Sequence, residues 1–198
     1  MEENLAPSPE RQEPKEEGLV YNLYYWLQTL VWAVVIIVLL FTFVGRITRV
    51  DGRSMLDTLH HGDLLLLQSI GYTPKTGDIV VLNKTAEETL SLLGGEAIVK
   101  RVIATGGQTV SIDYQTSTVY VDDQPLDEPY IHEEMDPRFG PYSGQTAFVV
   151  PEGSIFVMGD NRNESTDSRH ELLGTVDERY VLGRAVCILF PFSDFGLL

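Results

Sequence analysis

The stretch VDGRSMLDTL, Val50 to Leu59, decides how this chain folds, because a long apolar run ends just before it and a series of short apolar runs follows it. Ser54 stands near its centre, behind Gly52 and in front of Met55. Glycine and serine weaken helices and expose backbone, so the stretch predicts a turn that presents a hydroxyl group. A serine is a weak nucleophile at neutral pH unless a neighbouring base takes its proton. The rest of the chain must supply that base.

The preceding apolar run contains no charged residue from Gly18 to Gly45. Its densest part, Leu23–Val44, would be roughly 33 Å long as a helix, which is enough to cross the core of a bilayer. Aromatic residues crowd its first turns, as they do at a membrane interface. A cleaved signal peptide would begin with basic residues and be shorter, and a buried helix of a soluble core is rarely so uniform. We therefore expect a retained single transmembrane helix over residues 19–45.

Two further regions flank this helix. Residues 1–18 are rich in glutamate and proline and cannot bury enough apolar surface to order themselves, so we expect a flexible acidic tail. Residues 46–198 are enough for one globular domain, and no internal repeat marks a second one.

The basic residues near the helix bear on its orientation. Arg46, Arg49 and Arg53 follow the helix, whereas Arg11 and Lys15 precede it. Counted alone, these charges place the globular part in the cytoplasm by the positive-inside rule. The three arginines can instead belong to the folded domain, so the charge count leaves the orientation open.

After Ser54 the hydrophobic pattern changes to a period of two residues and to short apolar runs bounded by turn signals such as Gly106-Gly107. Many short strands without alternating helices predict a mainly β fold built of antiparallel sheet, with one short helix at Ala86–Leu93. The expected strands are Asp63–Gln68, Gly77–Asn83, Ala97–Ile103, Thr109–Asp113, Thr118–Asp122, Ala147–Val150, Ser154–Met158 and Val181–Phe190.

The composition excludes several classes of protein. A hydrophobic content of 43% excludes a wholly disordered chain, and a net charge of −15 argues against nucleic acid as a partner. Cys187 is the only cysteine, and its apolar surroundings predict a buried core residue. The four histidines show no metal-ligand spacing, so we expect no metal, no cofactor and no part for them in the chemistry. They are His60, His61, His132 and His170.

Among the candidate bases, Lys100 stands out within the sequence GEAIVKRVIATGG, Gly95–Gly107. Strand alternation places it on the same face as Ile98 and Val102. Apolar neighbours favour the neutral form of an amine and lower its pKa toward the range of a working base. This is one known way to activate a serine without a histidine. The alternative is a lysine whose stem packs on the sheet while its ammonium group reaches solvent. Arg101, the next residue and on the other face of the strand, is expected to have a structural role.

A further unusual stretch is GDNRNESTDSR, Gly159–Arg169, directly after an expected strand. It is dense in residues that can hydrogen-bond one another, including Asp160. Asp167 and Arg169 can form a charge-assisted pair that stiffens the loop, and Ser165 can reach toward the lysine or a water molecule. An ordinary solvated surface loop is the alternative.

Together these stretches resemble the conserved boxes of bacterial type I signal peptidases. The matching pieces are Ser54-Met55, Lys100-Arg101 and GDNR followed by Ser165-x-Asp167-Ser168-Arg169, with the flanking phrases HGDLLLL (61–67), TGDIVVL (76–82), EPYI (128–131) and GRAVCILFPFSDFG (183–196). The resemblance extends from Tyr21 to Gly196 and is to the small, Gram-positive-like form of the family, which has one amino-terminal helix.

This resemblance implies a membrane-bound serine endopeptidase that removes signal peptides from exported preproteins, cleaving after small residues. It implies that Ser54 is the nucleophile and Lys100 the general base, with Ser165 orienting the lysine and Asp167 and Arg169 holding the loop. The oxyanion would be bound by the Ser54 amide and by a second donor two residues earlier, at Gly52, which has no hydroxyl. The resemblance also implies a catalytic domain on the extracytoplasmic side of the lipid bilayer.

The chain departs from the family at Asp57, where the motif usually has proline (SMLDT against SM-x-P-T). Proline would restrict the turn after the nucleophile, whereas aspartate leaves it looser and adds a negative charge. A divergent relative that processes only a few substrates, such as pilin or surface-fibre subunits, fits this departure. An inactive membrane-anchored β module that binds exported segments is a third reading, but it has no need for both Ser54 and Lys100.

Overall fold

The computed structural model describes residues 17–43, 45–83, 97–139 and 146–198. The chain forms two compact units, Met1–Leu40 and Phe41–Leu198. The expected acidic tail, up to residue 16, and the expected short helix at Ala86–Leu93 lie outside the described residues.

A long apolar helix, α1 (Glu17–Phe43), begins the described chain. Its stretch Val20–Val38 has a mean hydropathy of 1.4, and none of that stretch is buried among the residues that the structure describes. A helix that is apolar on all sides and has no protein partner needs an apolar solvent around it. The helix is therefore a candidate membrane span, as the sequence predicts.

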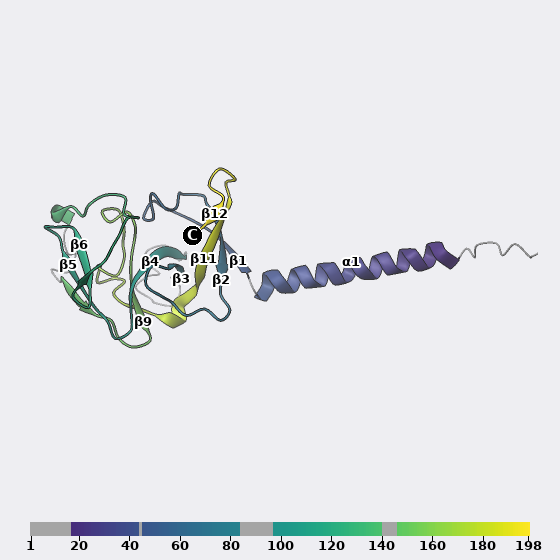
Figure 1. Ribbon diagram of the computed structural model, residues 1–198, viewed down its shortest axis with the longest axis horizontal. Coiled ribbons are helices and arrows are strands. Elements are labelled where there is room, and N and C mark those ends of the chain that lie inside the picture. The colour runs from purple at the N-terminus through teal and green to yellow at the C-terminus, as the bar shows by residue number, and fades with distance from the viewer. Residues whose placement is uncertain (1–16, 44, 84–96, 140–145) are drawn as a thin grey trace, which may run out of the picture. The chain divides into compact units, whose positions relative to one another are not determined.

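The second unit is built around an eight-stranded sheet in which all neighbouring strands are antiparallel (Figure 1). The strand order is β1-β2-β11-β3-β4-β9-β10, and β12 also pairs with β11. These strands are β1 (Gly45–Arg49), β2 (Leu64–Gln68), β3 (Ile79–Leu82), β4 (Ile98–Thr105), β9 (Ser154–Met158), β10 (Val176–Asp177), β11 (Val181–Phe190) and β12 (Gly196–Leu197).

A smaller sheet of four antiparallel strands, in the order β7-β6-β5-β8, completes the unit. In Figure 1 its strands β5 and β6 lie at the end of the unit away from β1 and β2. The remaining elements are β5 (Thr109–Asp113), β6 (Thr118–Val121), β7 (Gln124–Pro125), β8 (Ala147–Val149) and the short 3-10 helices η2 (Pro137–Phe139) and η3 (Glu178–Tyr180).

The fold is mainly antiparallel β, as predicted, and each expected strand is present. The bounds of β5, β9 and β11 are those expected, whereas the other expected strands differ by one or two residues at an end. The sequence pattern missed β1, β7, β10 and β12. Three of these have only two residues and exist because a longer strand pairs with them, which no local pattern reveals.

Strand β1 also changes the meaning of the arginines after the helix. Arg46 is paired with Leu67 of β2, and Arg49 with Leu64. Both arginines are therefore part of the folded sheet and not of a free flank. The positive-inside rule counts such arginines as flanking charges, so it gives little evidence here about which side of the membrane holds the globular part.

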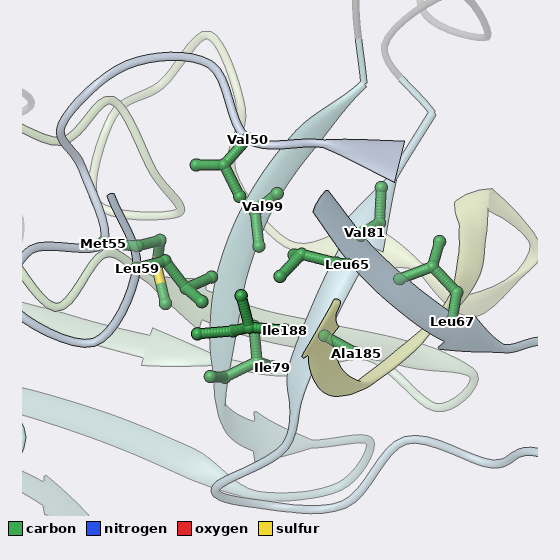
Figure 2. Packing of buried hydrophobic residues seen from close by; sticks show 10 residues of the cluster. All are labelled: Val50, Met55, Leu59, Leu65, Leu67, Ile79, Val81, Val99, Ala185 and Ile188. Carbon is green, nitrogen blue, oxygen red and sulfur yellow. The ribbon is translucent and has the colours of Figure 1, made fainter. Parts of the chain in front are cut away.

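One buried cluster connects the main sheet to the turn around Ser54. Figure 2 shows Met55 and Leu59 of this turn beside residues from β2, β3, β4 and β11. The cluster comprises Val50, Met55, Leu59, Leu65, Leu67, Ile79, Val81, Val99, Ala185 and Ile188. The turn is thus anchored in the core, which limits how far Ser54 can move.

The expectation that Cys187 is a core residue is wrong, because its side chain is partly exposed. Its cross-strand partner in β2 is Leu66, which is also only partly buried. Paired residues of an antiparallel sheet share a face. Cys187 therefore lies on the outer face of β11, and the neighbouring Ile188 is the residue that enters the core.

Candidate active site

The turn that carries Ser54 is closed by backbone hydrogen bonds as well as by its core residues. The Leu59 amide donates to the Met55 carbonyl at 2.8 Å. At the base of the turn, the Val50 amide donates to the Asp63 carbonyl at 2.8 Å, and the Gly62 amide donates to the Val50 carbonyl at 2.9 Å. The half-buried Ser54 hydroxyl is presented between these fixed points, in the turn that the sequence predicts.

Lys100 lies in the middle of β4 with its amine against this hydroxyl. Its Nζ is 2.7 Å from Ser54 Oγ, and the residue is 4% exposed. Its cross-strand neighbour Val80 belongs to a buried cluster that includes Val102, and Ile98 packs against the same cluster. Burial among apolar side chains disfavours an ammonium ion. The arrangement is that of a lysine held beside a nucleophile, not of one that extends into solvent.

The loop after β9 holds the backbone of the serine turn. The Asn161 amide donates to the Ser54 carbonyl at 3.0 Å, and Asn161 Nδ2 donates to the Arg53 carbonyl at 3.2 Å. Gly159 packs so closely that a Cβ there would lie 2.5 Å from the Ser54 carbonyl oxygen and 2.3 Å from Ser165 Oγ. The loop can approach the serine only because this position is glycine.

Asp160 connects the loop to the strand that carries the lysine. It is fully buried and accepts two hydrogen bonds from Arg101, at 2.8 Å from Nε and 2.6 Å from Nη2. The Thr58 hydroxyl, in the serine turn, donates to the same carboxylate at 2.6 Å. Arg101 also stacks on the Tyr130 ring, 3.9 Å from its centroid. Asp160 therefore ties together the loop, β4 and the serine turn, and Arg101 has the structural role expected of it.

Asp167 and Arg169 form the charge-assisted pair that the sequence predicts. Both residues are buried, and Arg169 donates to Asp167 at 2.8 Å from each of Nε and Nη2. Burial alone would raise the pKa of Asp167, but the charge and the hydrogen bonds of Arg169 outweigh it and hold that pKa below the ordinary range of an aspartate. The Asp167 carboxylate also accepts the Gly159 amide at 3.0 Å. The pair thereby positions the glycine that faces Ser54.

Ser165 does not make the expected contact. Its hydroxyl is buried and makes no hydrogen bond of normal geometry to Lys100 or to another described residue, although it lies close enough to the Asp167 carboxylate to help lower the pKa of that group. The hydroxyl instead occupies the space that the missing side chain of Gly159 leaves open. Ser165 is therefore close to the site without the orienting hydrogen bond to the lysine.

A third buried ion pair was not expected from the sequence. Arg162 is 1% exposed and donates through Nη1 to Glu128 at 3.0 Å and through Nε to the Gly159 carbonyl at 3.0 Å. Its Nη2 donates to the other oxygen of Glu128, which also accepts the Tyr130 hydroxyl. The sequence offered one indication of this pair, because Glu128 of the phrase EPYI (128–131) and Arg162 of GDNR have opposite charges.

A pocket of about 510 Å³ opens beside the serine turn. Its described lining includes Val50 and Asp51, at the start of the stretch that carries Ser54, and Ala97, just before β4, but neither Ser54 nor Lys100. Gly52, expected near the oxyanion, has a positive φ of 95° and donates its amide to His61 Nδ1 at 3.3 Å. The pocket is lined by Thr48, Arg49, Val50, Asp51, His61 and Ala97.

A family model described as signal peptidase, peptidase S26, matches residues 23–190, which include both unusual stretches and the lysine strand. The chain belongs to the signal peptidase family. It is similar to a probable signal peptidase I-1 of Synechocystis sp., with 40% identity over 84% of this chain and 82% of the relative. It is also similar to a signal peptidase I of Bacillus licheniformis, with 32% identity over 92% and 96% of the two chains.

A solved structure from the same family is also similar. It is a signal peptidase I of Enterococcus faecalis V583, with 26% identity, a TM-score of 0.43 and coverage of 58% of this chain and 98% of that one.

Asp57, at which the sequence motif departs from the pattern expected from the resemblance, lies at the surface of this site. Its carboxylate is 74% exposed and is 3.1 Å from His132 Nδ1. An exposed pair of this kind contributes little to stability. Asp57 thus adds a surface contact to the serine turn and takes no part in the buried network around Ser54.

One group of side chains could hold a metal ion within the described part of the chain. It consists of His60, Asp63 and Asp194, whose ligand atoms lie within 4.8 Å of one another. Spacing along the sequence could not reveal it, because Asp194 comes from the carboxyl-terminal loop. One Asp63 oxygen already accepts the His60 amide at 2.8 Å. That hydrogen bond explains the buried carboxylate without an ion.

Proposed function

We propose that this chain is a membrane-bound serine endopeptidase that removes signal peptides from exported preproteins. The observation that carries the proposal is the distance of 2.7 Å between Ser54 Oγ and the buried Lys100 Nζ. A hydroxyl beside a desolvated amine is the arrangement that a Ser–Lys nucleophile requires. Family membership supplies the class of substrate.

The reaction follows from the chemistry of this pair. Neutral Lys100 takes the proton of Ser54 as Oγ attacks the scissile carbonyl carbon, and the resulting ammonium gives that proton to the leaving amine. Water then attacks the acyl-serine ester, with Lys100 again accepting a proton, and the serine is released. The Ser54 amide has no hydrogen-bond partner among the described residues, so it is available to the oxyanion.

The pocket at the start of the serine turn supports recognition of an extended peptide. Strand β1, which supplies Thr48 and Arg49 to the pocket, is at the edge of the main sheet, where an extended chain can add as a further strand. Ala97 and Val50 give part of the wall an apolar character suited to small side chains. We assign this pocket to the residues of the signal peptide that precede the cleaved bond.

The outer face of the main sheet supports a position at the bilayer. Ile47, Leu66, Cys187 and Leu197 are successive cross-strand partners in β1, β2, β11 and β12 and therefore share one face. Ile47 is 53% exposed and Leu197 86%. A sheet face in contact with water is normally polar, and exposed apolar patches mark contact with a membrane or another protein. With the candidate span α1 in the same chain, we assign residues 1–18 to the tail, 19–45 to a single-pass anchor and 46–198 to a catalytic domain on the extracytoplasmic side.

The function can be tested with the full-length protein in detergent. Incubation with a preprotein that carries an Ala-x-Ala site should release a mature chain whose amino terminus, read by sequencing, follows the second alanine. The Ser54→Ala variant, purified in the same way, should release none. Cleavage at other positions, or equal cleavage by Ser54→Ala, would contradict the proposal.

A further inference from the structure

Three possible metal ligands meet where the end of the serine turn lies beside the carboxyl-terminal loop. They are His60, Asp63 and Asp194, each with a ligand atom within 4.8 Å of those of the other two. Imidazole combined with carboxylate is a ligand set for divalent transition metals such as Zn²⁺. The expectation of no metal site rested on spacing along the sequence, which cannot reveal a ligand set completed by a distant loop.

The carboxylate of Asp63 gives the strongest indication of a ligand. The residue is 1% exposed. Among the described residues its Oδ2 accepts the His60 amide at 2.8 Å, whereas its Oδ1 accepts no hydrogen bond and no arginine or lysine forms an ion pair with it. Buried carboxylates are normally paired with a cation or coordinate a metal. One oxygen of Asp63 is therefore available to an ion.

The short turn from His60 to Asp63 is closed in both directions. The His60 amide donates to the Asp63 carboxylate, and the Asp63 amide donates to the His60 carbonyl at 3.2 Å. A hydrogen bond of this kind orients a ligating carboxylate toward its metal. Because the same bond keeps the carboxylate stable without an ion, folding does not require the ion and binding can be reversible.

Strand pairing brings Asp194 to this turn. Phe190, at the end of β11, pairs with Leu64, which directly follows Asp63. The loop after Phe190 is closed at both ends, because the Asp194 amide donates to the Pro191 carbonyl at 3.1 Å and β12 pairs back onto β11. The backbone therefore keeps Asp194 near Asp63.

The charges of the cluster match a divalent cation. The side chains of His60 and Asp194 are exposed and have no hydrogen bond or ion pair with another described residue. Arg49 approaches the turn, 3.7 Å from the position of a Cβ at Gly62, but forms no ion pair with Asp63 or Asp194 in the described part of the chain. Two carboxylates and a neutral imidazole together neutralise one divalent ion.

We propose that His60, Asp63 and Asp194 bind a divalent transition cation, best matched by Zn²⁺, which ties the carboxyl-terminal loop to the serine turn. The inference is independent of the proposed peptidase function, because none of the three takes part in its proton transfers. Leu59, which precedes His60, belongs to the same buried cluster as Ile188 of β11 (Figure 2). The ion thus links, at the surface, two segments that share a core, and it stabilises the fold without entering the reaction.

Thermal unfolding tests the site in the full-length protein in detergent, after metal has been removed with a chelator. At a Zn²⁺ concentration of about 100 times the dissociation constant, measured by calorimetry, Tm should rise by about 5 °C or more. Ca²⁺ is the control for attraction by the net charge of −15, since it has the same charge but prefers oxygen ligands. It should raise Tm much less.

Two variants at exposed positions assign the effect to these residues. His60→Ala and Asp194→Asn should fold, because neither side chain is buried, and should lose most of the rise in Tm with Zn²⁺. The matched control is Asp123→Asn, at an exposed turn aspartate outside the cluster, which should respond to Zn²⁺ like the parent.

Hydrogen exchange followed by mass spectrometry locates the ion. Zn²⁺ should slow amide exchange in residues 191–198 of the parent but not of His60→Ala, although the substituted residue lies in a distant part of the sequence. Protection of this segment that persists in His60→Ala, or none in the parent, overturns the link between loop and turn.

The outcomes separate this inference from the proposed function. A Tm that does not rise with Zn²⁺, that rises equally with Ca²⁺, or that rises equally in the parent and in Asp194→Asn overturns the site, even if preprotein is cleaved. A rise specific to Zn²⁺ that requires His60 and Asp194 supports the site even if no preprotein is cleaved, in which case the peptidase function fails alone.

Discussion

At the scale of single residues, the proposed chemistry depends on the amine of Lys100. Lys100→Met keeps a similar length and an apolar stem but removes the base, so preprotein cleavage should fall to background. Lys100→Arg should also be inactive, because a guanidinium does not deprotonate in a protein. Since nucleophile and base act as a unit, the double variant with Ser54→Ala should be no worse than either single variant. Initial rates measured on gels, with circular dichroism to verify folding, check this.

The pH profile adds to this test. Because only the neutral amine can take the serine proton, the parental rate should rise with pH. Exchange of His132 or His170, or addition of a chelator, should leave the rate nearly unchanged. A Lys100→Met variant that cleaves at close to the parental rate would rule out the Ser54–Lys100 pair.

At Asp57, unlike at Lys100, we expect a substitution that does not lower activity. Asp57→Pro should preserve or raise activity, because proline restricts the turn after the nucleophile and the lost contact with His132 is exposed. The measurement is kcat/KM on a preprotein, compared with Asp57→Ala, which removes the same contact without the restriction. A tenfold loss in Asp57→Pro alone, about 1.4 kcal/mol in the barrier, would assign Asp57 a function of its own.

At the scale of elements, the approach of the loop after β9 to the serine turn depends on Gly159. A Cβ at this position would lie 2.5 Å from the Ser54 carbonyl oxygen, which is backbone and cannot rotate away. Gly159→Ala should therefore push the loop and the turn apart and lower kcat/KM by at least about tenfold, or about 1.4 kcal/mol. In Gly196→Ala, where the nearest atom to a Cβ is at 3.8 Å, kcat/KM should change little. Equal values for both variants would show that the contact is not needed.

The stability of this loop depends on the Asp167–Arg169 pair. Asp167→Asn leaves a buried guanidinium without its charge partner, which should cost about 3–5 kcal/mol of unfolding free energy. Asp136→Asn, which breaks an exposed pair, should cost less than about 1 kcal/mol. Thermal or urea unfolding of the purified variants measures both.

The same pair sets a pH dependence. The pKa of Asp167 is lowered in the folded protein, so the carboxylate stabilises the fold fully above the ordinary aspartate pKa of about 3.9. That contribution is lost as the pH falls through the lower pKa of the folded state. The difference in Tm between the parent and Asp167→Asn should therefore be largest near neutral pH and shrink in acid. A constant difference down to the most acidic pH would contradict the assignment.

The sequence predicted more of the elements than of the contacts between them. Apolar periodicity located the long strands and the helix, because burial imposes that pattern along each element. The contact between Ser54 and Lys100 could be expected from chemistry and resemblance. The pairing of Arg101 with Asp160 could not, because the tertiary fold alone brings those residues together.

At the scale of the whole molecule, α1 should keep the protein in the membrane. Alkaline carbonate should leave the full-length chain in the pellet, because none of the apolar stretch Val20–Val38 is buried among the described residues, which leaves it to be covered by lipid. Protease added to intact spheroplasts should digest the β-rich unit, because preproteins emerge on that side. Release by carbonate would refute the anchor, and protection from protease would refute the orientation.

The pairing of the loop arginines has a consequence for the behaviour of the enzyme in salt. Arg101, Arg162 and Arg169 are each matched to a carboxylate, and the charged groups of these pairs are almost completely buried. Mobile ions screen exposed charges over about 10 Å at 0.1 M ionic strength but act far less on buried pairs. Salt should therefore act mainly on the exposed charges of the chain, which has a net charge of −15. Changes in ionic strength should alter how substrates and lipids approach this protein. The buried ion pairs around its nucleophile should change little.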